Sequence, residues 1–194
     1  MSFQVRQALR EATDAAHRRL HHHPVLAPLA AATLTRAQYG AGLAALHGVH
    51  AAADRALAAR WPERTPRAPL IAVDLRALGL DPDRLDAADT LPAYESDAAL
   101  LGGRYVIDGS AFGTQSMLGN VRRTLGLDAA TGASFFAGGT LNTSDDWRAM
   151  LAALEGLRTP DERDRARAAA EATFAAVERW LDRRANPGPE DVKS

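Results

Sequence analysis

Arg10 and His17, near the start of the chain, are the first residues whose types and spacing could support chemistry. They are seven residues apart in a stretch whose apolar residues recur at helical spacing. Both side chains are therefore expected on one side of a helix, two turns or roughly 10 Å apart. Imidazoles bind transition metals and guanidinium groups pair with carboxylates. The pair favours a ligand that carries both a metal ion and a carboxylate. A single histidine beside an apolar stripe is, however, more often structural.

Glycines mark a second stretch, residues 101–114, in a region that otherwise favours a helix. Gly102, Gly109 and Gly113 fall seven and four residues apart, so they share one helix face. Each destabilises a helix interior by about 1 kcal/mol relative to alanine, and we expect another body to approach the backbone closely there. A neighbouring helix and a flat ligand explain the pattern equally well. A transmembrane dimer face is excluded by the charged residues in and around the stretch: Arg104, Asp108, Arg122 and Arg123.

The other histidines give weaker signals. The consecutive residues 21–23 are all histidine and point in different directions at a helix end, so we interpret them as solvated. His47 and His50 are three residues apart on a predicted helix that contains no glutamate. A four-helix di-iron site takes glutamate ligands from its helices, so this pair is interpreted as core or surface histidines. The sequence has neither a P-loop nor a nucleophile elbow.

The elements that must position these residues are all predicted to be helical. Apolar spacing and capping signals indicate one all-α, multi-helix domain over residues 1–185, followed by a disordered tail at 186–194. Thr35 and Gln38 form one predicted capping box, and Thr159 and Glu162 form another behind a proline. The predicted helices span about 5–20, 35–60, 70–78, 96–118 (extending to 125 with a bend at Gly119), 143–157 and 160–184.

The composition excludes several classes of function. The chain has 194 residues, 46% of them hydrophobic, and a net charge of -1, which gives no general electrostatic basis for binding nucleic acid or an anionic membrane. It has no cysteine, which excludes disulfides, thiolate metal sites and a cysteine nucleophile. The first residues contain no apolar segment typical of a signal peptide, so a cytoplasmic location is expected.

Two segments resemble the haem oxygenase family, in particular its bacterial branch associated with bacteriophytochromes. They are Leu9-Arg-Glu-Ala-Thr-Asp-Ala-Ala-His17 and Tyr105-Val-Ile-Asp-Gly-Ser-Ala-Phe-Gly113, and the similarity covers most of the chain. The first is similar to the proximal helix, whose histidine ligates haem iron, which implies that role for His17. The second is similar to the kinked distal helix, whose glycines let the backbone lie over haem, which implies that role for Gly109 and Gly113. Residues 172–181 are similar to the closing helix.

The sequence also departs from the family pattern. Ser110 stands where many members have an aspartate that orders distal water, and a serine at this position is in keeping with the bacteriophytochrome-linked branch. Thr114 follows Gly113 where a second glycine is common, and His21 replaces a glutamate found in some relatives. These departures leave open a related protein that binds haem or a phytochrome without turning haem over.

The resemblance implies an oxidoreductase that uses O2 and electrons from a reductant to cleave haem to biliverdin, carbon monoxide and iron. Haem would be both substrate and cofactor, with electrons from an external donor such as ferredoxin and a bacteriophytochrome as the biliverdin acceptor. Arg10 would pair with a haem propionate, Gly109 and Gly113 would confine the reacting group, and Ser110 would anchor distal water. A thiaminase-like function, the third alternative, usually relies on a cysteine, which this chain lacks.

Overall fold

The computed structural model describes residues 4–86, 91–138 and 143–186, with the backbone alone for 111–116, 143 and 144. Every regular element in these ranges is helical, which confirms the predicted all-α class. The α-helices are α1 (Gln4–His21), α2 (Arg36–Ala58), α3 (Ala68–Ala77), α4 (Asp97–Leu125), α5 (Thr143–Glu155) and α6 (Pro160–Ala185). Two short 3₁₀ helices, η1 (Ala27–Ala30) and η2 (Pro82–Arg84), lie in the connections. The predicted tail lies outside the described residues from 187 onward.

Capping side chains account for where the long helices begin. The Thr35 hydroxyl accepts a hydrogen bond from the Gln38 backbone, and the Gln38 side chain accepts one from the Thr35 backbone, so this predicted capping box is confirmed. Thr159 and Glu162 form the second predicted box at the start of α6. At the other end of α4, Gly126 takes a left-handed conformation (φ 69°) that glycine adopts without strain. The helix runs unbroken through Gly119 to Leu125.

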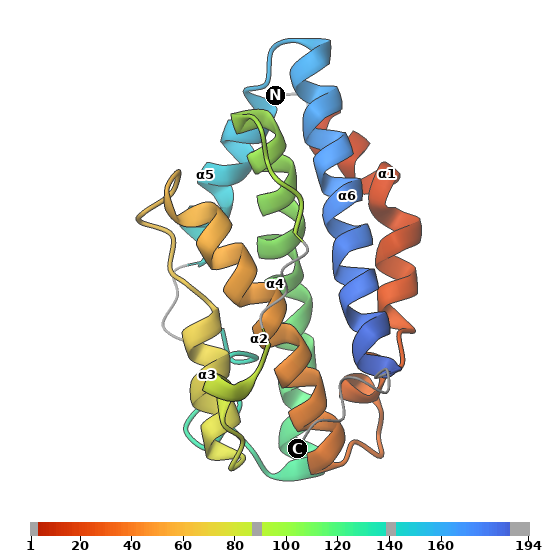
Figure 1. Ribbon diagram of the computed structural model, residues 1–194, viewed down its shortest axis with the longest axis vertical. Coiled ribbons are helices and arrows are strands. Elements are labelled where there is room, and N and C mark those ends of the chain that lie inside the picture. The colour runs from red at the N-terminus through yellow and green to blue at the C-terminus, as the bar shows by residue number, and fades with distance from the viewer. Residues whose placement is uncertain (1–3, 87–90, 139–142, 187–194) are drawn as a thin grey trace.

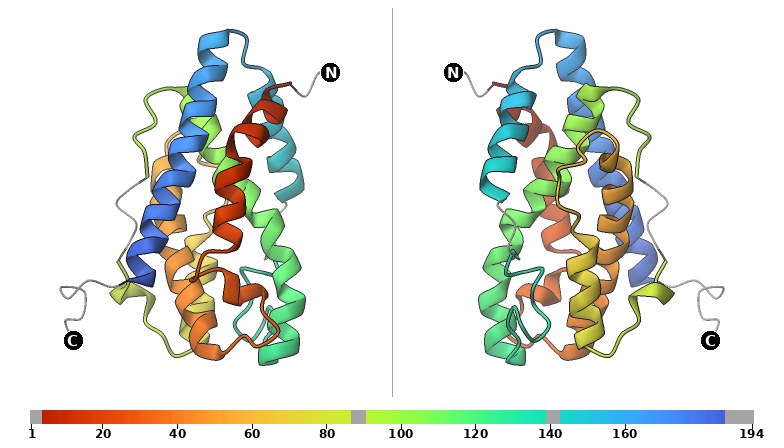
Figure 2. Two further views of the ribbon diagram at one scale, coloured as in Figure 1. Left: turned by 90° about the vertical axis from the view of Figure 1, so that its right-hand side faces the viewer. Right: turned by 90° about the vertical axis from the view of Figure 1, so that its left-hand side faces the viewer.

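The helices are arranged around α4 (Figure 1). It packs against α6, α5 and α2, whereas α1 packs against α6 and α5, and α3 covers α2. The two side views show α1 running beside α6 on one side of the bundle and α2 with α3 on another (Figure 2). One hydrophobic cluster has members from α1, α4, α5 and α6 and holds these four helices together. A second cluster joins α2 and α3 to the segment after α4.

The start of α1 is held by a residue from the far end of the chain. The backbone N–H groups of Val5 and Arg6 donate to the Glu155 carboxylate of α5 at 3.3 and 3.0 Å. These N–H groups have no partner within their own helix, so Glu155 acts as the cap that α1 lacks locally. Val5 and Leu9 are buried in the cluster below.

Gly102 is explained by helix packing. A Cβ atom added to it would lie 2.0 Å from the backbone oxygen of Ala166 on α6. No side chain fits at that distance, so glycine allows the backbones of α4 and α6 to approach each other. The packing alternative is therefore confirmed for this glycine.

The segment after α4 is fastened by buried polar groups. Asp74 of α3 is fully buried and accepts hydrogen bonds from the backbone N–H groups of Ser134 and Phe135 at 2.8 and 2.9 Å. The Tyr39 hydroxyl of α2 donates to the Gly132 carbonyl at 2.8 Å. These bonds hold an apolar loop, as predicted for residues 131–141 where they are described, against the core.

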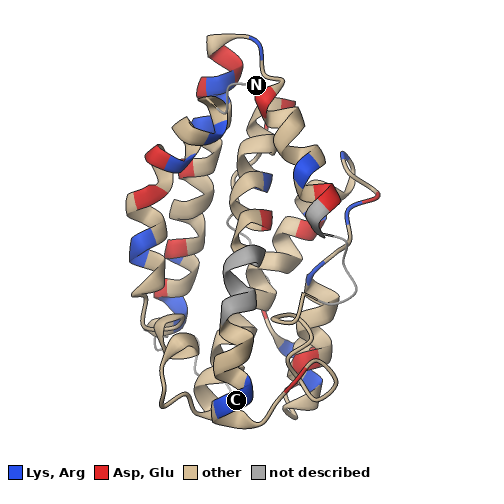
Figure 3. Cartoon of the chain, turned by 180° about the vertical axis from the view of Figure 1, so that it is seen from behind, with Lys and Arg blue, Asp and Glu red and all other residues tan. Residues whose placement is uncertain are grey.

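Charged residues of both signs follow the outer helices α1 and α6 (Figure 3). Several form exposed pairs within one helix, such as Arg18 with Asp14 and Arg165 with Asp161. Pairs of this kind contribute little to the free energy of unfolding. No helix in the described part of the chain has both the length and the hydropathy needed to cross a membrane.

Candidate functional site

His17 lies on the exposed side of α1, near its C-terminal end. Its ring centroid is 4.5 Å from that of His21 and 6.3 Å from that of Phe174 on α6, both in edge-on geometry. Partial burial lowers the pKa of His17 below its ordinary value, and the charges of His21 and Arg10 lower it further, against the opposing effect of Asp14. His17 is therefore neutral at pH 7, the state in which an imidazole nitrogen can ligate a metal.

Arg10 lies on the same exposed side of α1 and close to α4. Burial raises the pKa of the Tyr105 phenol on α4, and the nearby charges of Arg6 and Arg10 oppose that rise. The two guanidinium groups therefore face Tyr105. Among the residues that the structure describes, no carboxylate pairs with Arg10, so its charge is available to an anion from outside the protein.

Gly109, in the middle of α4, faces an aromatic side chain of α5. A Cβ atom added to Gly109 would lie 3.2 Å from Cη2 of Trp147. The Trp147 ring also stacks on Tyr105, with centroids 5.9 Å apart and planes 23° apart. The indole thus covers one edge of the face that Gly109 leaves open, and both aromatic side chains are only half-buried.

Ser110 is exposed beside Gly109. Its hydroxyl donates to the backbone oxygen of Ile107 at 2.6 Å, so its proton is held by its own helix while its lone pairs can accept from water. Gly113 and Thr114 belong to α4, but their surroundings lie outside the described residues.

The arrangement of helices brings the two predicted segments near each other. Both α1 and α4 pack against α5 and α6, which lie on either side of them. Arg6 and Arg10 of α1 lie near Tyr105, the first residue of the second segment, and this proximity brings the two segments together. The described contacts of His17 are with α1 and α6 and not with α4.

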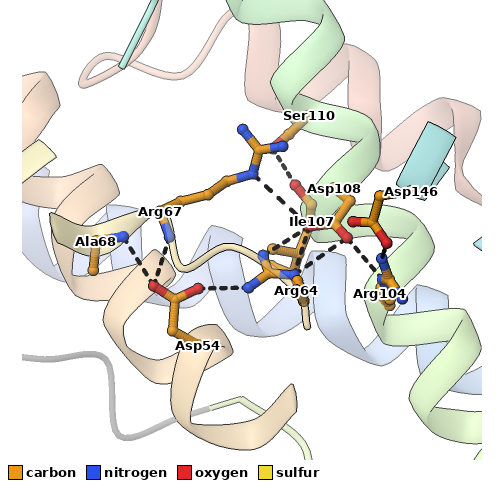
Figure 4. Close-up of polar contacts among 9 residues, drawn as sticks. All are labelled: Asp54, Arg64, Arg67, Ala68, Arg104, Ile107, Asp108, Ser110 and Asp146. Carbon is orange, nitrogen blue, oxygen red and sulfur yellow. Dashed lines mark hydrogen bonds and ion pairs between the residues drawn. The ribbon is translucent and has the colours of Figure 1, made fainter. Parts of the chain in front are cut away.

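A buried ionic cluster occupies a different side of α4 (Figure 4). Asp108 accepts hydrogen bonds from Arg64 at 2.7 Å and from Arg104 at 2.9 Å. Arg64 also donates to Asp54 at 2.6 Å, and Arg104 donates to Asp146 of α5 at 2.5 Å. The cluster thereby links α2, the connection after it, α4 and α5.

Electrostatics keep the cluster charged. Burial alone would raise the pKa of the Asp108 carboxyl, but the hydrogen bonds and charges of Arg64 and Arg104 outweigh it, and the pKa lies below its ordinary value. Arg104 is only 2% exposed and also lies over the ring of Trp61, 4.8 Å from its centroid. Removing one member of such a cluster leaves a buried charge without its partner.

Sequence reasoning missed this cluster. In the sequence, Arg104 and Asp108 were interpreted only as charges that argue against a membrane helix. The available signal was the spacing of four residues between Arg104 and Asp108 in an otherwise apolar helix, which pairs them on one face.

The two histidines of α2 belong to the protein interior. His50 is 2% exposed and His47 is half-buried, and the Nδ1 atoms of both are buried without a hydrogen-bond partner in the described chain. Burial lowers the pKa of His50 to about 4, so it is neutral at pH 7. Within the described ranges, no group of three His, Cys, Asp or Glu side chains is arranged to hold a metal ion. The interpretation of His50 as a core residue is confirmed, whereas the interpretation of residues 21–23 as solvated is wrong for His23, which is buried and contacts Asp182 of α6.

Comparison with known proteins adds no name to this geometry. No protein-family model matches the chain, and no curated protein is similar to it.

Proposed function

We propose that this protein binds haem between α1 and α4 and, with O2 as the oxidant and electrons from an external reductant, cleaves it to biliverdin, carbon monoxide and iron. The observation that carries the proposal is the neighbourhood of Arg10 and Tyr105, which joins the helix of His17 to the helix of Gly109 and Ser110. The two resembling segments are 88 residues apart in sequence, counted from His17 to Tyr105, yet Arg10 of the first lies near Tyr105 of the second.

The described residues fit haem chemically. His17 offers a neutral, exposed imidazole of the kind that ligates haem iron. Arg10 offers a guanidinium without a carboxylate partner in the described chain, and it is seven residues from His17 on the same helix side. A haem carries its iron at the centre and its carboxylates at one edge, so an iron ligand and a cation two turns apart match these two positions.

Each residue would have a separate task. His17 would hold the iron from the α1 side, and Arg10 would fix the orientation of the ring by pairing with a carboxylate. Gly109 would keep the α4 side free of a side chain, and the Ser110 oxygen would accept a hydrogen bond from water beside it. Bound haem would itself supply the iron chemistry, with electrons from an external donor such as ferredoxin.

Haem titration followed by single turnover with ascorbate or ferredoxin tests the proposal. The purified protein should develop a Soret band at one equivalent of haem and then yield biliverdin and carbon monoxide. His17→Ala should lose the imidazole-ligated spectrum while its circular dichroism stays helical. His22→Ala, which removes an exposed histidine of the neighbouring turn, is the matched control and should leave the spectrum unchanged.

Other outcomes lead to different conclusions. An unchanged spectrum in His17→Ala would exclude His17 as the ligand. Haem binding without biliverdin would favour the alternative of a haem-binding relative that performs no turnover. A protein that gives no Soret band at all would contradict both.

A further inference from the structure

We propose that Trp147, backed by Tyr105, forms a wall that fixes the in-plane orientation of the bound macrocycle and so selects which bridge carbon is oxidised. This inference rests on the proposed function, because it concerns the seating of haem between α1 and α4. No sequence motif or family resemblance pointed to Trp147.

The position of the indole carries the inference. Cη2 of Trp147 lies 3.2 Å from where a Cβ atom added to Gly109 would stand, which is closer than most contacts that real Cβ atoms make. The indole therefore lies against one edge of the helix face on which Gly109 has no side chain. A flat ligand on that face meets the indole at its border, which limits how far the ligand can slide or rotate in its plane.

Tyr105 supports the wall on the side of the cations. Its ring stacks on Trp147, and its phenol lies near Arg6 and Arg10. Stacked aromatic pairs are stabilised beyond their area burial by about 0.5 to 1.5 kcal/mol. The wall thus stands at the end of the site where the carboxylates of the ligand would pair, and that edge defines the in-plane orientation.

The buried ionic cluster gives the wall a fixed base. Asp146 immediately precedes Trp147 and accepts a 2.5 Å hydrogen bond from Arg104, whose side chain is in turn bonded to Asp108 on the same helix as Gly109. Trp147 is therefore attached to α4 both through its ring and through the residue before it. A side chain anchored in this way is suited to orient a ligand.

The test compares Trp147→Ala with wild type in the haem-loaded protein. Proton NMR of the ferric, cyanide-ligated complex reports the in-plane orientation through the shifts of the haem methyl groups, independently of activity. We expect one dominant set of methyl resonances in wild type and a second, populated set in Trp147→Ala. In single turnover the ratio of biliverdin isomers should change severalfold, with little change in the Soret band.

Leu151→Ala is the matched control. Leu151 is half-buried one turn further along α5 and packs on the same hydrophobic cluster. Its truncation should lower stability without altering the methyl shifts or the isomer ratio. If both variants change the isomer ratio alike, the effect is general loosening of α5 and the inference is wrong.

Two further outcomes are decisive. Unchanged methyl shifts and isomers in a folded, haem-loaded Trp147→Ala would overturn the role of the wall while leaving the proposed function intact. Should that variant fail to fold, Trp147→Phe keeps an aromatic ring but loses the edge that faces Gly109, and the same absence of change in it would overturn the inference. A wild-type protein that binds no haem would instead refute the proposed function itself.

Discussion

Two sides of α4 differ in the residues that they present to their surroundings. On one side, Asp108 and Arg104 are buried in a cluster of ion pairs that ties α4 to α2 and α5. On another, Gly109 and Ser110 have small or no side chains, and the neighbouring helix α1 contributes an exposed histidine and an exposed arginine for which the described residues supply no carboxylate partner. The difference teaches that one helix can be held firmly by buried ion pairs on one side while it presents small residues on another.

Disrupting the ionic cluster around Asp108 should have the largest effect on stability. Asp108→Asn removes the charge that faces Arg64 and Arg104 and leaves both guanidinium groups buried. We expect the free energy of unfolding to fall by about 3 to 5 kcal/mol, measured by urea denaturation. Glu171→Gln, which breaks an exposed pair with Arg167 on α6, is the control and should change it by less than about 1 kcal/mol. Equal losses would mean that the cluster is no anchor.

The glycines sharpen the comparison along one face. Gly102→Ala introduces a Cβ atom against the Ala166 backbone and should lower the free energy of unfolding by about 3 kcal/mol, the upper part of the range for overpacking. Gly109→Ala meets only the edge of an indole, and the gain of about 1 kcal/mol in helix propensity offsets the strain. Thermal melts of the two apoproteins should therefore differ clearly. A Gly109→Ala protein that melts as low as Gly102→Ala would show that this part of the face is as tightly packed.

Two histidines extend the comparison to pH. Since burial holds the pKa of His50 at about 4 against an ordinary value of 6.5, the unfolded chain binds the proton more readily between these values. The contribution of neutral His50 to the free energy of unfolding is therefore fully present above that window. It is lost as the pH falls through the window, by about 2 kcal/mol at pH 5. His50→Phe should lose less stability than wild type between pH 7 and pH 5. His22→Gln, an exposed control, should keep the wild-type slope.

The smallest effect is expected at Arg10, on the exposed side of α1. Arg10→Glu reverses an exposed charge, so haem affinity should fall by no more than about tenfold, measured by haem titration. The ratio of biliverdin isomers should change as well, since the pairing guides orientation. Arg18→Glu on the same helix, where Arg18 already pairs with Asp14, is the control. Identical behaviour of the two variants would argue against a carboxylate partner for Arg10.

The helices were predictable from the sequence because their signals are local. The capping boxes at Thr35 and Thr159 and the apolar spacing of α1 depend on residues within a few positions of one another. The pairing of α4 with α6 was not predictable, because Gly102 gives the same signal for a helix and for a flat ligand. Only the position of Ala166 distinguishes the two.

The candidate site was predictable in part. Arg10 and His17 do share the exposed side of α1, and their roles toward haem stay predictions. Trp147 had no local signal, since it comes to Gly109 from a different helix. The ionic cluster was hidden for a similar reason: Arg64 and Arg104 resemble surface arginines until the chain folds and brings Asp108 and Asp54 to them.

The cap that Glu155 provides for α1 has a consequence for the order of folding. During synthesis the N-terminal helix leaves the ribosome first, but the carboxylate that completes it is made about 150 residues later. An isolated helix of 18 residues is marginal in water, so α1 stays only partly formed until α5 and α6 have emerged. We therefore expect the helix that carries His17 to dock only after α5 has been made, late relative to its own synthesis.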